Sequence, residues 1–526
     1  MGLPAALEGL KHATAYPHPV QRIEVVETHV SWIVLTGDYS YKIKRPVQLS
    51  FLDATRLERR HELCEEEVRL NRRLAPEIYL GVCAITGTGN DVRVGASVAE
   101  APVEYAVRMR QFDRECELDR LVAQDQLTAE ELVAFGTELA AWHGELPPLP
   151  DAPAYDDPGA VAKLIGTNAR ECVDALEDLG QSDRAKALGR SLDEYVNTRR
   201  AALAERAQAN AFRECHGDLH LSNLVRIAKR VIAFDCLEFK RSFRCIDVAD
   251  EVSFLCADLE ASRRSDLAQH FLNAYLARSG DFGLCSVLNL YAAHRALVMA
   301  KTAAMRKSSA AVVDQYLSTA EAALTRPRPL CVVMCGLSGS GKSWLASRVA
   351  PLIQAVHVRS DIERKRAAGL DPTESSNSGL GADLYDADHT HQTYTRLEQC
   401  AHQALGGQCN VILDATFLKE VQRGQMRRLA ETCGAHFVIV RCVAAADILE
   451  KRLDDRSKAG NDASEADVAV MKRQLTSMEE LTAEERRNLI EVDTADPHTV
   501  TTVTAALRAL TRLNRPPGPK VVPFSD

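Results

Sequence analysis

The sequence predicts two domains of the α/β and α+β classes in one chain of 526 residues. A chain of this length exceeds what a single hydrophobic core usually holds. Alternating apolar and polar residues over 31–44 predict a β-hairpin, and helical patterns follow over 56–74, 128–145 and 159–208. An apolar strand pattern then leads directly into a glycine-rich loop and a helix. We therefore expect a β-rich lobe, a mainly helical lobe and a doubly wound parallel sheet with a helical lid.

The predicted boundary between the domains is TRPRPL, residues 325–330. There an alanine-rich helical segment, 308–324, gives way to the apolar run LCVVMCG. Prolines ahead of a buried-strand pattern are typical of a linker. We predict a first domain over 1–325 and a second over 326–512, and a disordered tail over the proline-rich residues 513–526.

Composition and charge exclude several classes of protein. With 46% hydrophobic and 26% charged residues, the chain has the composition of a globular protein. It lacks a secretion leader pattern and a long uncharged apolar run, so we expect a cytoplasmic protein without a membrane partner. Its fifteen cysteines contain no C-x-x-C pair, which favours reduced thiols. A net charge of −9 argues against nucleic acid as a partner.

The first chemical pattern is CHGDLHLSN, residues 215–223, which places Asp218 and Asn223 in H-x-D-x-x-x-x-N. Asp235 follows at the end of the next apolar segment. In kinase-like enzymes the first Asp orients or deprotonates the acceptor hydroxyl, while the Asn and the second Asp hold Mg²⁺ against the phosphates. The intervening residues, 224–234, are predicted to form a hairpin that brings the two metal ligands together.

This loop resembles the signature of the aminoglycoside phosphotransferase family, and the resemblance extends over most of residues 20–320. It implies a two-lobed, protein-kinase-like fold that binds ATP. Lys42, two positions after a small residue on the same strand face, is then the expected phosphate-pairing lysine, and Lys44 on that face is the competitor. Glu67, on the next helix, is expected to orient the lysine, with the adjacent carboxylates Glu65 and Glu66 as alternatives.

The second chemical pattern is GLSGSGKS, which follows the apolar strand and precedes a helix. Its G-x-x-x-x-G-K-S spacing is that of a phosphate-binding P-loop. Backbone N–H groups close around the phosphates, Lys342 reaches the β- and γ-phosphate oxygens, and Ser343 supplies a ligand to Mg²⁺. The predicted cofactors are ATP and Mg²⁺. The predicted nucleotide contacts are Gly336, Leu337, Ser338, Gly339, Ser340, Gly341, Lys342 and Ser343.

Two carboxylates, Asp361 and Asp414, stand at the ends of later predicted strands. Parallel strands end on the edge where open sheets bind ligands, so we expect both beside the P-loop. Arg452 and Arg456 lie four residues apart on a predicted helix, ahead of a segment rich in Gly, Asn, Asp and Ser that is typical of a mobile lid. The alternative for these arginines is a solvated helix face paired with neighbouring aspartates.

The second domain resembles, over about residues 330–510, the small P-loop kinases that include polynucleotide 5′-kinases, zeta toxins and chloramphenicol phosphotransferase. This resemblance implies Asp361 as the base toward an acceptor hydroxyl and Asp414 as a Walker-B-like residue in the metal shell. It also implies Arg456 as a catalytic lid arginine and Arg423 as a substrate or phosphate contact. The order of the domains resembles bacterial fusions of an aminoglycoside phosphotransferase-like domain with an ATP-binding domain.

Together the patterns predict an ATP-dependent phosphotransferase whose two modules transfer the γ-phosphate to a hydroxyl of a small-molecule acceptor. The alternatives are a regulatory or toxin-like ATP-binding protein whose kinase-like domain is a sensor, and a nucleic-acid-end kinase. One helical pattern, 289–305, carries Tyr291, Arg295 and Lys301 on one flank. If that flank faces the acceptor of the first domain, an anionic or neutral sugar-like acceptor is expected; a solvated helix face is the other interpretation.

Overall fold

The computed structural model describes residues 3–49, 52–95, 100–149, 157–371, 387–459 and 466–512. The chain folds into two compact units. The first comprises Met1–Glu131, Leu146–Tyr155 and Phe212–Glu251, and the second comprises Leu132–Glu145, Asp156–Ala211 and Val252–Asp526. The predicted tail lies outside the described residues, and the predicted division at 325 and 326 stays a prediction.

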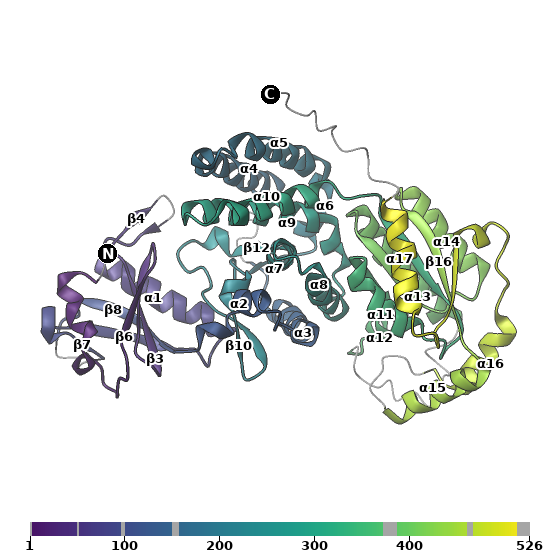
Figure 1. The fold of residues 1–526 in the computed structure, drawn as a ribbon, viewed down its shortest axis with the longest axis horizontal. Coiled ribbons are helices and arrows are strands. Elements are labelled where there is room, and N and C mark those ends of the chain that lie inside the picture. Colours follow the sequence, from purple (N-terminus) through teal and green to yellow (C-terminus); the bar gives the residue numbers. More distant parts are fainter. Residues whose placement is uncertain are drawn as a thin grey trace. The chain divides into compact units, whose positions relative to one another are not determined.

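The first unit contains a six-stranded antiparallel sheet in the order β1-β2-β3-β8-β6-β7 (Figure 1). The predicted hairpin at its centre is confirmed, because β2 and β3 pair with Ser31 opposite Lys44 and Ile33 opposite Lys42. Side chains two apart on a strand share a face, so Lys42 and Lys44 point the same way. The strands are β1 Glu24–Glu27, β2 Ser31–Leu35, β3 Tyr39–Lys44, β6 Tyr79–Thr86, β7 Arg93–Val94 and β8 Glu104–Arg110.

Helix α1, Leu57–Asn71, packs on this sheet, as the helical pattern predicts. Its residues Cys64 and Val68 join a buried cluster with Tyr79 and Val107 of the sheet. Glu67 lies between them on the buried stripe of the helix. The packing that buries the apolar face of α1 therefore also carries one carboxylate into the interior.

Three short antiparallel pairs also lie in the first unit, one of them between β4, Gln48–Leu49, and β5, Leu52–Asp53. Strand β9, Phe212–Glu214, pairs with β12, Cys245–Asp247, and β10, Leu224–Ile227, pairs with β11, Arg230–Ala233. The two turn residues between β10 and β11 both have positive φ, which suits the right-handed twist of a tight hairpin. The predicted hairpin is thus confirmed, and beyond its last pair the Phe234 N–H donates to the Asn223 carbonyl at 3.0 Å.

Helices of the second unit form what we call the helical lobe, residues 157–208 and 252–324. Helix α9, Cys285–Met305, is its buried centre and packs against several of the others. Among the described residues, Phe282–Met305 is the one helical segment long and apolar enough to cross a membrane, and 78% of its apolar window is buried inside the protein. The surrounding helices are α4 Pro158–Ala175, α5 Ser182–Thr198, α6 Arg200–Gln208, α8 Ser265–Ser279 and α10 Ala310–Leu324.

The remainder of the second unit is a five-stranded parallel sheet in the order β14-β15-β13-β16-β17. Apolar residues of β13 pack on helices α11, Lys342–Leu352, and α17, Thr499–Arg512. Helices α13, Ala387–Gly406, and α14, Glu420–Thr432, cover the opposite face (Figure 1). Both predicted fold classes are confirmed. The strands are β13 Leu330–Cys335, β14 Ala355–Arg359, β15 Asn410–Asp414, β16 His436–Val443 and β17 Leu489–Asp493.

The helical lobe and the parallel-sheet domain meet in a close seam. The Asn289 side chain of α9 donates to the Gly407 carbonyl at 2.8 Å. Arg326, in the segment between α10 and β13, bonds both Asn289 and the carboxylate of Glu260. At Gly407 the two backbones touch, since a Cβ there would lie 1.9 Å from the Cys285 carbonyl oxygen.

This contact predicts that Gly407→Ala lowers the free energy of unfolding by about 1–3 kcal/mol, because backbone cannot yield to the added methyl group. Gly406→Ala is the matched control, since a Cβ at Gly406 meets nothing within 4 Å. Urea-induced unfolding of the full chain measures both variants. Equal stability of the two variants would contradict the seam.

Candidate nucleotide-binding sites

The site in the first unit is centred on Glu67, whose carboxylate is fully buried. Lys42 Nζ donates to Glu67 Oε1 at 2.8 Å and also bonds the Asp235 carboxylate. The alternatives to Glu67 have other partners, because Glu65 pairs with a histidine one turn earlier and Glu66 pairs with arginines. The structure thus brings together three predicted residues from β3, α1 and the segment after β11.

Lys44 occupies the deeper position on the same strand face. It bonds the second oxygen of Glu67 and, at 2.5 Å, Glu238 Oε1. Burial alone would lower the pKa of Lys42, but Asp235 and Glu67 raise it well above its ordinary value. Both lysines therefore stay charged, and Lys42 is the one that reaches Asp235. Sequence reasoning missed Glu238, although it lies only three residues after Asp235.

The predicted loop after β9 places Asp218, Asn223 and Asp235 at one end of the β10–β11 hairpin. Asn223 Nδ2 donates to Asp218 Oδ2 at 2.9 Å, so the side-chain oxygen Oδ1 of Asn223 is the atom that could bind a metal. Asp235 has a φ of +62°, an unusual conformation for a residue other than glycine and one found often at functional sites. Its backbone N–H donates to the Tyr79 hydroxyl at 3.0 Å, which holds that conformation. These oxygens suit Mg²⁺.

The loop itself is held by Glu251. Its two carboxylate oxygens accept the backbone N–H groups of His216, at 3.1 Å, and Gly217, at 2.6 Å. The ring of His216 bonds the Phe234 carbonyl at 2.8 Å, and burial lowers the pKa of this histidine, so it is a neutral structural group. The loop that carries Asp218 is therefore fixed by charged and neutral hydrogen bonds on both sides.

The P-loop of the second unit runs from the end of β13 into α11, as predicted. Gly336 has a φ of +142°, and a Cβ there would lie 2.5 Å from the Cys442 carbonyl oxygen, so only glycine fits. Lys342 Nζ donates to the Leu337 carbonyl at 2.7 Å, across the loop. Burial lowers the pKa of Lys342, although Asp414 opposes that shift. Lys342 is thus a buried amine held against the backbone of the loop.

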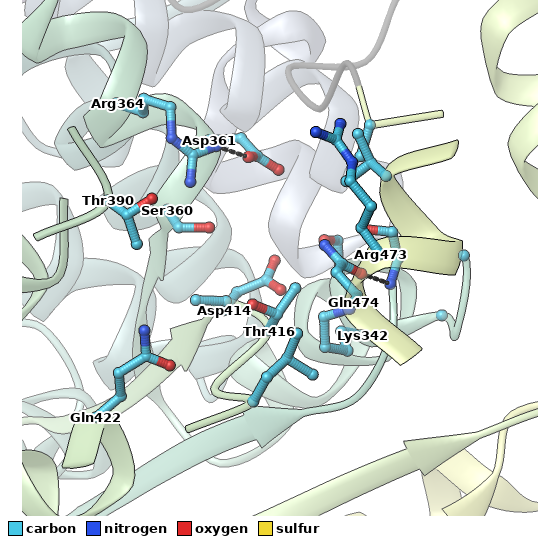
Figure 2. Close-up of a pocket in the computed structure, with 18 of the residues that line it drawn as sticks. Lys342, Ser360, Asp361, Arg364, Thr390, Asp414, Thr416, Gln422, Arg473 and Gln474 are labelled. Atoms are coloured by element: carbon cyan, nitrogen blue, oxygen red, sulfur yellow. Dashed lines mark hydrogen bonds and ion pairs between the residues drawn. The ribbon is translucent and has the colours of Figure 1, made fainter. Parts of the chain in front are cut away.

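A cavity of about 550 Å³ extends from the P-loop, and the site residues predicted for the second domain line it. Lys342, Ser343, Asp361, Asp414 and Arg456 all line it, and Figure 2 shows Asp361 and Asp414 facing the same space as Lys342. Glycine-rich backbone, a lysine, a hydroxyl and two carboxylates surround one volume. This arrangement can hold a polyphosphate and Mg²⁺ with one of the two carboxylates. The other carboxylate is not needed for that binding.

The two carboxylates differ in their partners. Asp414, at the end of β15, accepts from His357 Nε2 at 3.2 Å. Burial raises its pKa, but His357, Arg359 and Ser343 together outweigh burial, so the pKa falls below its ordinary value. Asp361, on α12, Ser360–Ala367, pairs with Arg364 at 2.7 Å and borders the cavity. Asp414 thus stays in its negatively charged form. A hydrogen bond from the Ser343 hydroxyl also lowers the pKa of Asp414.

The predicted lid arginines also border the cavity. They stand on α15, Ala446–Ala459. Arg452 donates to the Thr494 hydroxyl oxygen at 2.8 Å and to the Gly339 carbonyl at 3.4 Å, and Arg456 donates to the Ala466 carbonyl. The predicted lid segment beyond this helix falls largely outside the described residues.

Two interpretations are wrong. Arg423 is fully buried and pairs with Glu485 at 2.7 Å, so it anchors the segment before β17 and cannot contact a substrate. Arg295 is buried with its guanidinium 4.7 Å from the centre of the Phe254 ring, and Lys301 pairs with Glu171 at 2.8 Å. Both cations are used inside the helical lobe, so they give no information about an acceptor.

Sequence reasoning also missed residues that line the cavity. Gln474 Oε1 accepts the Ser338 N–H of the P-loop at 2.8 Å, and its neighbour Arg473 lies near Lys342 (Figure 2). Both stand on α16, Val468–Ser477. Arg364 could have been found, since it follows Asp361 by three residues on one helix face. Nothing in a single sequence marks Gln474.

Comparisons with known proteins agree with the P-loop geometry. Residues 331–481 match the family described as AAA domain. The uncharacterized protein Rv2004c of Mycobacterium tuberculosis is 30% identical over 459 residues, which cover 86% of this chain and 90% of that protein. The uncharacterized protein Mb2027c of Mycobacterium bovis matches with the same figures.

Among solved structures, a gluconokinase from Sinorhizobium meliloti covers 36% of this chain and 97% of its own, with 19% identity and a TM-score of 0.26. A choline kinase from Cryptosporidium parvum covers 58% of this chain and 87% of its own, with 12% identity and a TM-score of 0.36.

The buried charges of the first site predict the effect of removing Lys44. Lys44→Met leaves Glu238 and one Glu67 oxygen without a cation, so we expect a loss of about 3–5 kcal/mol in the free energy of unfolding. The double variant Lys44→Met, Glu238→Gln removes one of the unpaired charges and should be the more stable of the two. Thermal and urea unfolding compare them, and a double variant that is less stable than Lys44→Met would contradict the pairing.

Proposed function

The chain belongs to the same family as the two mycobacterial proteins, and we propose that it is an ATP-dependent phosphotransferase with two nucleotide-binding modules. The observation that supports this best is the cavity beside the P-loop. A phosphate-binding backbone with its lysine, a pair of oxygen ligands for Mg²⁺ and a separate carboxylate line the same space. These are the parts that transfer of a phosphoryl group to a hydroxyl requires.

In the P-loop module, the backbone N–H groups and Lys342 bind the β- and γ-phosphates and balance their charge. Ser343 and Asp414 would hold Mg²⁺, which when bound draws electrons from the γ-phosphate. Asp361 accepts the proton of the acceptor hydroxyl, whose oxygen forms a bond to the γ-phosphorus as the bond to the ADP oxygen breaks. Arg456 stabilises the charge that moves between them.

In the first module, Lys42, oriented by Glu67, binds the nucleotide phosphates, and Asn223 and Asp235 would hold the metal. The contact between Lys42 and Asp235 supports this assignment, because it places the predicted phosphate-binding cation beside a predicted metal ligand. Asp218 lies beside Asn223, which donates to its carboxylate, and it accepts the proton of a second acceptor hydroxyl.

The charge of the P-loop cavity indicates what its acceptor carries. Among the described residues that line it, six are basic and two are carboxylates, Asp361 and Asp414. Mg²⁺-bound ATP neutralises only part of this surplus. We therefore propose a small hydroxyl compound that bears a carboxylate or phosphate group. A 5′-hydroxyl nucleic-acid end also fits a basic cavity and is the second candidate. The basic residues are Lys342, Arg364, Lys419, Arg452, Arg456 and Arg473.

Variants of the full chain test the P-loop module in a Lys42→Ala background, which silences the first site. Lys342→Ala should abolish ATP turnover with its fold intact, because the lysine balances phosphate charge at the mouth of the loop. Asp361→Asn should keep nucleotide affinity and lower phosphoryl transfer at least about 100-fold, since a base touches only the acceptor. Turnover and fluorescent-ADP binding are measured together, and unchanged turnover in Lys342→Ala would refute the assignment.

Matched acceptors test the charge argument. With γ-labelled ATP, label transfer is compared for glucose against gluconate, for glycerol against glycerol 3-phosphate, and for a 5′-hydroxyl oligonucleotide. We expect the anionic member of at least one pair to be the better acceptor, and Lys342→Ala to remove that transfer. Efficient transfer to the neutral members alone would contradict an anionic acceptor, whereas transfer to the oligonucleotide alone would favour the second candidate.

A further inference from the structure

Strand β14 is the edge strand of the parallel sheet, so one side of its backbone has no neighbouring strand among the described residues. A side chain of the helical lobe takes that place. Asn273 on α8 donates from Nδ2 to the Ala355 carbonyl at 3.1 Å, and its Oδ1 accepts the His357 N–H at 3.0 Å. Gln269, one turn earlier, supports the same oxygen at 3.2 Å. The carboxamide of Asn273 therefore makes the backbone hydrogen bonds that a neighbouring strand would make along this edge.

The residue held in this way carries the imidazole that contacts Asp414. His357 bonds Asn273 through its backbone and Asp414 through its side chain, with Nε2 3.2 Å from Oδ2. Both side chains are nearly enclosed, at 10% and 3% exposure. A displacement of the β14 backbone would therefore move the ring directly, and with it the orientation of the carboxylate.

We infer that His357 and Asn273 are positioning residues for Asp414, so that the helical lobe helps to set the affinity of the P-loop site for Mg²⁺-bound nucleotide. This inference rests on the proposed function of that site. A carboxylate that is already held in one orientation loses less freedom when it binds a metal, and partners of metal ligands commonly change metal affinity by about 10–100-fold.

Several other contacts across the seam lie away from Asp414. Asn289 bonds Gly407, which precedes β15 at the opposite end of that strand from Asp414. Arg366 and Arg396 bond carbonyls at the end of α8 and support α12 and α13. The seam thus offers a matched pair of asparagines, one connected to Asp414 through His357 and one not.

The experiment measures the affinity of the full chain for fluorescent ADP with and without Mg²⁺, in the Lys42→Ala background. We expect Mg²⁺ to tighten binding in the parent. His357→Ala should reduce that gain about tenfold, and Asn273→Ala should reduce it by a smaller factor, while metal-free affinity stays unchanged. His357→Gln, which keeps a donor, should recover part of the gain, and Asn289→Ala should leave it unaltered.

The double variant Asn273→Ala, His357→Ala should match His357→Ala alone, because Asn273 acts through the histidine. Should Asn273→Ala fail to fold, Gln269→Ala is the milder variant and should shift the gain in the same direction. An unchanged Mg²⁺ gain in all variants, an additive double variant, or an equal loss with and without Mg²⁺ would each overturn the inference. A parent without any Mg²⁺ gain would instead overturn the proposed function of the site.

Discussion

A carboxylate that is buried inside a protein must be paired, and both candidate sites are built around one. In the first unit Glu67 accepts a different lysine on each oxygen, which ties α1 to two positions of β3. In the second unit Asp414 is enclosed at the end of β15, where His357 is its partner. In each unit a lysine suited to bind phosphate stands close to the buried carboxylate. Lys42 bonds Glu67, and Lys342 lines the same cavity as Asp414.

The same constraint explains why the sites are supported from a distance. Glu251 fixes the loop of the first site through two backbone N–H groups, and Gln474 fixes the P-loop through one. Polar groups that would otherwise be buried without partners are satisfied by side chains from later in the chain. The residues that hold each site therefore come from several separate parts of the sequence.

The seam between the helical lobe and the parallel sheet follows the edge-strand rule. Strand β14 would present unpaired backbone groups, and Asn273 covers them. The covered strand also carries His357, whose ring contacts Asp414 in the candidate metal site. A single residue, His357, therefore connects the contact at the sheet edge to that site. Packing and chemistry are connected at this point by ordinary hydrogen-bond geometry.

Local patterns determined much of this protein. The P-loop, the hairpin after Asn223 and the periodicity of α1 are short-range features, in which spacing alone places a glycine, a turn or a buried face. Tertiary structure alone decided which partner each long side chain takes. It chose Lys42 for Asp235 and Lys44 for Glu238, buried Arg423 against Glu485, and joined Asn273 to Asp414 through His357. The reason is physical: a flexible side chain can reach several partners that are distant in sequence, and only the packed chain shows which one is within hydrogen-bonding distance.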